Sequence, residues 1–117
     1  MGLLQTPFEI MDPDYTEIRY VSGSNVAAGT PVVLTGNLLV PIGPVTANVE
    51  AAFAVRAKKA LVAKAAPLEL AAGAKVYWDA ADGNVNASDS GNTLCGHVSK
   101  PAASADTTVE IVFDGLN

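Results

Sequence analysis

Apolar residues in this chain come in short runs that alternate with polar or small residues and are separated by turn sequences. The clearest run is Lys75–Asp79, in which Val76 and Trp78 fall on one face of an extended segment. Alternation with period two is typical of a half-buried β-strand. Further strands are predicted at 17–21, 31–34, 38–42, 84–86, 94–98 and 107–113.

Glycine-containing turns join several of these runs into hairpins. Thr35-Gly36-Asn37 separates two apolar runs, and Asp82-Gly83 follows the strand predicted at 75–79. Glycine readily adopts the positive φ that tight hairpin turns require. Short strands at spacings of about 8–12 residues are typical of all-β domains. The sequence therefore predicts an all-β fold, a small barrel or sandwich of short antiparallel strands.

Residues 49–66 fit two descriptions. The alanines and lysines favour a helix by intrinsic propensity, whereas Val49, Phe53 and Val55 alternate with smaller or charged residues as in a strand. The neighbouring strands favour the second description. We therefore predict two strands, at 49–56 and 60–64, joined near Lys58 and Lys59.

One internal similarity is visible in the sequence. Ala27–Leu34 reads AAGTPVVL and Ala71–Trp78 reads AAGAKVYW, and a Gly-Asn pair follows each within five residues. Two similar units, each a glycine turn, a strand and a hairpin, would explain it. Two units are fewer than the three or more that make a repeat protein.

The first 16 residues follow neither a helical nor a strand period. Pro7 and Pro13 interrupt regular structure. A solvated tail does not normally carry several large apolar side chains. We therefore predict an extended arm at 1–16 that docks on a partner or on a neighbouring subunit, followed by a single β-rich domain at 17–117. The residues predicted to bind the partner are Leu3, Leu4, Phe8 and Ile10.

Composition limits the possible functions. The chain has 117 residues, a net charge of −5 and only 7 lysines and arginines, so it is poorly equipped to neutralise nucleic-acid phosphates. A single cysteine excludes an intramolecular disulfide and a Cys-rich zinc site. No apolar run approaches the length of a membrane-spanning helix. We expect no nucleic-acid partner, no membrane association and no cofactor.

Candidate chemistry is sparse. Cys95 and His97 would share a face of a strand, but a small buried cysteine beside a histidine at a strand edge explains them more simply. Asp79, Asp82 and Asp89 lie among asparagines without the spacing of a calcium loop, so turn formation is expected. Neither a catalytic nor a metal site is predicted. Tyr77 and Trp78 face opposite sides of a strand, one as a core anchor and the other at the surface or an oligomer contact.

Five segments together resemble the capsid decoration, or head cement, proteins of tailed bacteriophages. Gly73–Asp79 (GAKVYWD) is the most specific of them, followed by Gly91–Gly96 (GNTLCG) and the closing run Asp106–Phe113 (DTTVEIVF). Gly29–Val33 and Gly36–Leu38 complete the likeness, which covers about residues 22–113. These segments are structural and include no catalytic motif.

The resemblance implies a structural virion protein, made in the host cytoplasm and placed on the capsid exterior. Its partner would be the major capsid protein, and it would clamp adjacent capsid subunits after head expansion. A homo-oligomer is implied, with a trimer favoured. Two other functions stay open: a carbohydrate- or receptor-binding β-module of a phage tail or fibre, and a small enzyme that uses Cys95 and His97.

Overall fold

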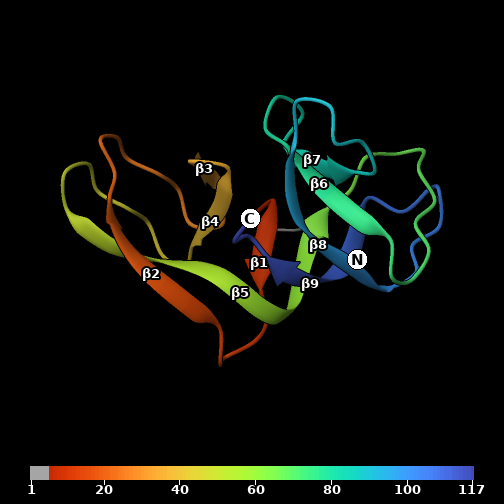
Figure 1. Cartoon of the computed structure of the whole chain (residues 1–117), viewed down its shortest axis with the longest axis horizontal. Coiled ribbons are helices and arrows are strands. Elements are labelled where there is room, and N and C mark those ends of the chain that lie inside the picture. The colour runs from red at the N-terminus through yellow and green to blue at the C-terminus, as the bar shows by residue number, and fades with distance from the viewer. Residues whose placement is uncertain (1–5) are drawn as a thin grey trace.

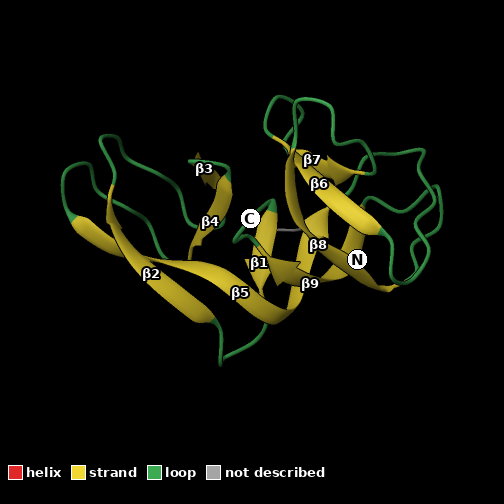
Figure 2. Cartoon of the chain, in the orientation of Figure 1, coloured by secondary structure: helices red, strands yellow, loops and turns green. Residues whose placement is uncertain are grey.

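The computed structural model describes residues 6–117, and within this range the chain forms nine β-strands and no helix (Figure 2). The strands are β1 (Phe8–Ile10), β2 (Thr16–Val21), β3 (Val32–Leu34), β4 (Asn37–Pro41), β5 (Glu50–Ala63), β6 (Lys75–Asp79), β7 (Asn84–Asn86), β8 (Thr93–Lys100) and β9 (Thr108–Asp114). The all-β prediction is confirmed. Every pair of neighbouring strands in the sheet is antiparallel.

The strands form one strongly curled sheet, a half-barrel, in the order β3-β4-β5-β9-β8-β6-β7. Both β1 and β2 also pair with β5, outside this path. Figure 1 shows two lobes, one containing β2, β3 and β4 and the other containing β6 to β9, with β5 running through both. The fold is therefore organised around this one long strand.

Strand β5 corrects the prediction for residues 49–66. It is one strand of 14 residues, neither a helix nor two separate strands. The predicted break near Lys58 and Lys59 is instead a bulge, because the register against β9 shifts between Ala57 and Ala60. Both faces of β5 are covered, Ala54 by one core cluster and Phe53 and Val55 by the other. Burial on both sides explains the small side chains that resembled a helical sequence.

The large side chains form two hydrophobic clusters, and the larger one joins Leu38 and Val40 of β4 to residues of the second lobe. In the larger cluster the ring of Phe8 makes edge contacts with Phe113 and Trp78, at centroid distances of 4.9 and 6.1 Å. In the smaller cluster the ring of Tyr20 meets Phe53 edge-on at 5.7 Å. Such edge-to-face pairs add about 1 kcal/mol each beyond the area they bury.

The described part of the N-terminal segment is not a free arm. Phe8–Ile10 pairs with residues 60–62 of β5, and Phe8 is only 1% exposed, at the centre of the larger cluster. The main chain here also packs closely on Gly29, where an added Cβ would lie 2.9 Å from the carbonyl oxygen of Phe8. No strand period is visible at the N-terminus because β1 is only three residues long. Leu3 and Leu4 lie outside the described residues.

The sequence similarity between the two lobes has a structural counterpart. In each Ala-Ala-Gly turn the residue after glycine donates to the first alanine, Thr30 N to Ala27 O at 3.2 Å and Ala74 N to Ala71 O at 3.1 Å. Both glycines have positive φ, 73° at Gly29 and 85° at Gly73.

The hydrogen bonds that dock these two turns also correspond. Each glycine amide donates to a strand of its own lobe: Gly29 N to Pro41 O of β4 at 2.9 Å, and Gly73 N to Val98 O of β8 at 2.8 Å. The residue four positions after each acceptor forms an antiparallel β-bridge with a residue just before the glycine turn. These bridges join Val45 to Val26 and Ala102 to Leu70. The two lobes therefore have the same arrangement of turn, strand and bridge. The first half of β5 is the last strand of the first lobe, and its second half is the first strand of the second lobe.

Candidate functional site

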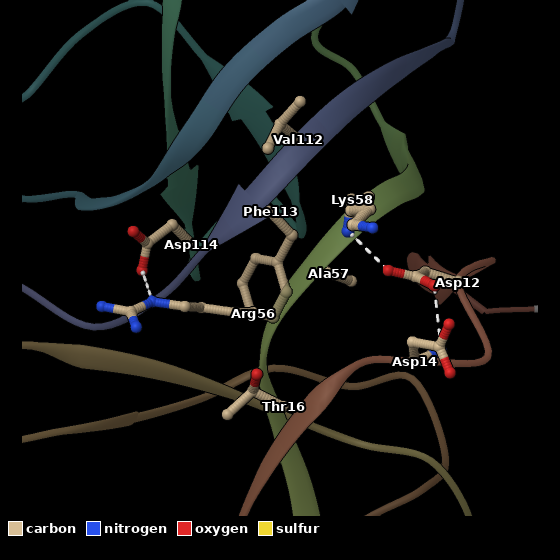
Figure 3. A pocket seen from close by; sticks show the side chains of 9 residues that line it. All are labelled: Asp12, Asp14, Thr16, Arg56, Ala57, Lys58, Val112, Phe113 and Asp114. Carbon is tan, nitrogen blue, oxygen red and sulfur yellow. Dashed lines mark hydrogen bonds and ion pairs between the residues drawn. The ribbon is translucent and has the colours of Figure 1, made fainter.

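A cleft lies at the junction of the two lobes (Figure 3). It arises because β5 changes partners along one side: β2 pairs with residues up to Arg56, and β1 begins pairing at Ala60. The connection between β1 and β2 crosses this gap. The cleft has a volume of about 260 Å³ and is lined by Asp12, Asp14, Thr16, Arg56, Ala57, Lys58, Val112, Phe113 and Asp114.

The cleft combines an apolar floor with a charged rim. The floor is formed by Ala57 and the ring of Phe113, with Val112 standing beside them (Figure 3). On one side Arg56 Nε donates to Asp114 Oδ1 at 3.2 Å. Both side chains are about half exposed, so this ion pair contributes at most about 1 kcal/mol to stability.

The opposite side of the cleft is fixed by Asp12. Its carboxylate accepts the backbone amide of Lys58 at 2.9 Å and that of Asp14 at 2.9 Å. These two backbone hydrogen bonds, that of Lys58 first, lower the pKa of Asp12. The charged carboxylate thus fastens the loop between β1 and β2 to the bulge of β5. This arrangement suits contact with an apolar side chain flanked by polar groups.

The structure separates Cys95 from His97 despite their spacing. Cys95 is fully buried and its thiol donates to Val76 O at 3.5 Å, whereas His97 is exposed. The cause is a bulge in β8: Val76 pairs with Gly96 and Tyr77 with Leu94, so Cys95 is the extra residue. His97 pairs with strands on both sides, which corrects its predicted place at a strand edge.

Burial raises the pKa of the Cys95 thiol to about 12. We expect no reaction with a thiol-specific disulfide reagent at pH 8 in the native protein, and full reaction in denaturant. An unfolded thiol ionises near 9, so stability should fall as the pH rises from about 9 toward 12. Cys95→Ala should reduce that alkaline slope in urea titrations. Rapid labelling of the native protein would contradict this assignment.

The aspartates and asparagines after β6 form turns, as predicted. Asp79 Oδ1 accepts the amides of Ala81 and Asp82 at 3.0 and 3.2 Å. Asn86 Oδ1 accepts the amide of Ser88 at 2.9 Å and an amide proton of Asn92 at 3.3 Å. Asp79 and Asn86 therefore stabilise the local turns, whereas the buried Oδ1 of Asn84 has no hydrogen-bond partner in the described part of the chain. No group of metal-ligating side chains occurs among residues 6–117.

The two adjacent aromatics differ in burial. Trp78 is only 4% exposed, in the larger cluster, while Tyr77 is half-buried on the other face. A carbohydrate-binding module would need an exposed aromatic platform, and the indole of Trp78 is not available for one. Of the four residues predicted to contact a partner, Phe8 is a core residue and Ile10 is half-buried against that core.

Comparison with known proteins decides the family. The model of the phage cement protein family matches residues 13–113. The chain belongs to the phage cement protein family. Neither the curated proteins nor the solved structures that were compared contain a match. The resemblance noted in the sequence is thereby confirmed, and with it a structural, capsid-associated role in the virion.

In this cement protein the cleft residues were not found from the sequence. Arg56 and Asp114 are 58 positions apart and meet only because β5 pairs with β9. Asp12 and Lys58 are 46 positions apart, and nothing in the sequence around either residue indicates the other.

No helix in residues 6–117 is long and apolar enough to cross a membrane.

Proposed function

We propose that this protein binds the outer surface of the expanded phage capsid and stabilises it by clamping adjacent major capsid subunits as a homo-oligomer. The observation that carries the proposal is the family match over residues 13–113. A ligand that binds only the assembled, expanded shell stabilises it by mass action. Many modest contacts repeated around the shell are sufficient for that role, and no bond-making chemistry is required.

The lining of the cleft supports it as a capsid contact. Val112 is 46% exposed beside the buried ring of Phe113, so the cleft offers an apolar surface inside a rim of both charges. Interfaces commonly place an apolar centre within a polar rim. The residues of the cleft come from β5, β9 and the β1–β2 connection, so the site is held by the rigid centre of the fold.

A valine pair tests this contact. Val112 and Val33 are exposed to 46% and 47% and both lie in strands, but only Val112 lines the cleft. We expect Val112→Asp to reduce binding to expanded heads at least about tenfold, because it would bury a charge at the contact. Val33→Asp is the matched control and should bind normally. Equal co-sedimentation of both variants with heads would exclude the cleft as a contact.

The N-terminal segment is the second proposed contact. Removal of residues 1–16, as the idea of a free arm would suggest, would take Phe8 out of the core and destabilise the fold. Replacing Leu3 and Leu4 with serine changes no residue of the described strands. We expect this double variant to keep its unfolding midpoint and to lose occupancy on expanded heads. Unchanged occupancy would show that these leucines are not capsid contacts.

Binding to heads in two states tests the function itself. Purified protein should co-sediment with expanded heads and not with unexpanded procapsids, and saturated heads should release their DNA at a higher temperature. Equal binding to both states would contradict selective clamping of the expanded lattice. Absence of binding to either would contradict the capsid-surface role.

A further inference from the structure

Strand β2 presents the longest free strand edge of the described sheet. It pairs with β5 on one side only, and no described strand pairs with its other side (Figure 1). It is six residues long, whereas the outer strands β3 and β7 have three each. Proteins usually protect sheet edges by keeping them short or covering them, because a free edge can pair with another strand. By this criterion β2 is the edge that remains open to pairing.

The side chains of β2 are exposed although some are apolar. Ile18 and Val21 are 36% and 50% exposed, and every residue of β2 is exposed except Tyr20, which is half-buried. Ile18 lies directly opposite the buried Phe53 of β5. A second strand along this edge would cover the open side of Ile18 and extend the apolar surface that begins at Phe53.

The charge pattern of β2 indicates which strand would fit. Glu17 and Arg19 flank Ile18 and, two residues apart, share the other face of the strand. If two copies of β2 pair antiparallel about a two-fold axis at Ile18, Glu17 of each copy lies opposite Arg19 of the other. The two isoleucines then meet on the axis, on the opposite face. Opposite charges directly across a strand pair stabilise it, whereas like charges destabilise it.

The existing ion pairs of Arg19 leave it available for this contact. It lies 3.6 Å from Glu17 and 4.0 Å from Glu50 of its own chain, and its side chain is 61% exposed. Exposed pairs of this length contribute little, so little is lost when the guanidinium turns toward a second carboxylate.

We propose that β2 is a self-pairing edge, through which two copies of this chain join into one continuous antiparallel sheet with Ile18 on the two-fold axis. The contact is isologous, so it closes on a dimer, and a threefold assembly on a capsid would use a different face. The interface is small and the dimer is therefore weak in solution. On a shell, the same contact would link neighbouring copies held at high local concentration.

Charge reversal gives the first test, on purified protein without capsids, so that its result is independent of the capsid function. Sedimentation equilibrium up to about 1 mM protein is expected to show a monomer–dimer equilibrium for the native chain. Glu17→Arg or Arg19→Glu alone should weaken the dimer at least about tenfold, since each places two like-charge pairs across the axis. The double variant Glu17→Arg/Arg19→Glu should restore it. Lys75→Glu, on β6, is the matched control and should leave it unchanged.

A cysteine on the two-fold axis gives the second test. Residues directly opposite on antiparallel strands have Cβ atoms about 4.5–5.5 Å apart, close to disulfide geometry, so Ile18→Cys should form a covalent dimer under mild oxidation. Val21→Cys is exposed but off the axis, and it should crosslink far more slowly. The native Cys95 does not interfere because it is buried.

The outcomes are distinct. Dimerisation that follows the charge pattern, together with selective crosslinking at position 18, would establish the self-pairing edge. A strictly monomeric protein, a dimer or trimer insensitive to charge reversal, or equal crosslinking at positions 18 and 21 would each overturn it.

Discussion

Gly96→Ala is expected to prevent stable folding. Gly96 lies in the bulge of β8 with a φ of 149°, a region that L-residues with a side chain rarely adopt. An added Cβ would overlap the carbonyl oxygen of Val112 and lie 3.1 Å from its carbonyl carbon and 3.3 Å from Phe113 Cα. All three atoms are backbone atoms of β9, so no side-chain rotation relieves the overlap. We expect a loss of more than about 4 kcal/mol in the free energy of unfolding.

Two other glycines separate the steric effect from the backbone effect. Gly73 has a φ of 85° but no atom within 4 Å of an added Cβ, so Gly73→Ala should cost about 1–2 kcal/mol. Gly43 has neither a positive φ nor a close neighbour, and Gly43→Ala should change stability by about 0.5 kcal/mol or less. Urea denaturation followed by circular dichroism measures all three. A Gly96→Ala protein as stable as Gly73→Ala would show that β8 and β9 can move apart.

Lys64→Met is expected to have the second largest effect. Lys64 is only 3% exposed, and its ammonium group donates to the carbonyl oxygens of Leu68, Ala65 at 2.8 Å and Ser104 at 3.5 Å. Methionine fills similar space but cannot donate, so these carbonyls would lose their partner. Leaving a buried acceptor without a hydrogen bond costs about 1–3 kcal/mol. We expect a net loss of about 3 kcal/mol.

The surface lysine Lys75 is the control for this substitution. It is exposed at the start of β6, and Lys75→Met should leave the urea midpoint nearly unchanged. The same charge is removed in both variants, so the difference between them isolates the hydrogen bonds made by Lys64. Equal stability of the two variants would mean that Lys64 is not the tie between the loops at 65–68 and 104.

The predicted strands agree with the structure where hydrophobic period and turn chemistry reinforce each other. The hairpin of β3 and β4 turns at Thr35-Gly36, both with positive φ, and the Gly-Asn sequence indicated it. The strand at 75–79 was also identified with its correct bounds. In both cases the information lies within a few neighbouring residues.

Prediction failed where distant segments determine the structure. The ring of Phe8 is buried because β1 pairs with residues 60–62 of β5, and no local pattern at the N-terminus reveals that pairing. Strand β5 looked helical because both of its faces are buried and small residues suit that position. The cleft depends on the bulge of β5 near Lys58 and on two interactions between residues far apart in the sequence. These are the ion pair of Arg56 with Asp114 and the hydrogen bond from the Lys58 amide to Asp12.

The sharing of β5 between the two lobes determines how the molecule melts. Neither unit has a full set of strands without the residues of β5 that it shares with the other unit, so neither half can keep its sheet when the other unfolds. Heat should therefore disrupt both lobes in one event, with a single calorimetric peak and no surviving half-molecule.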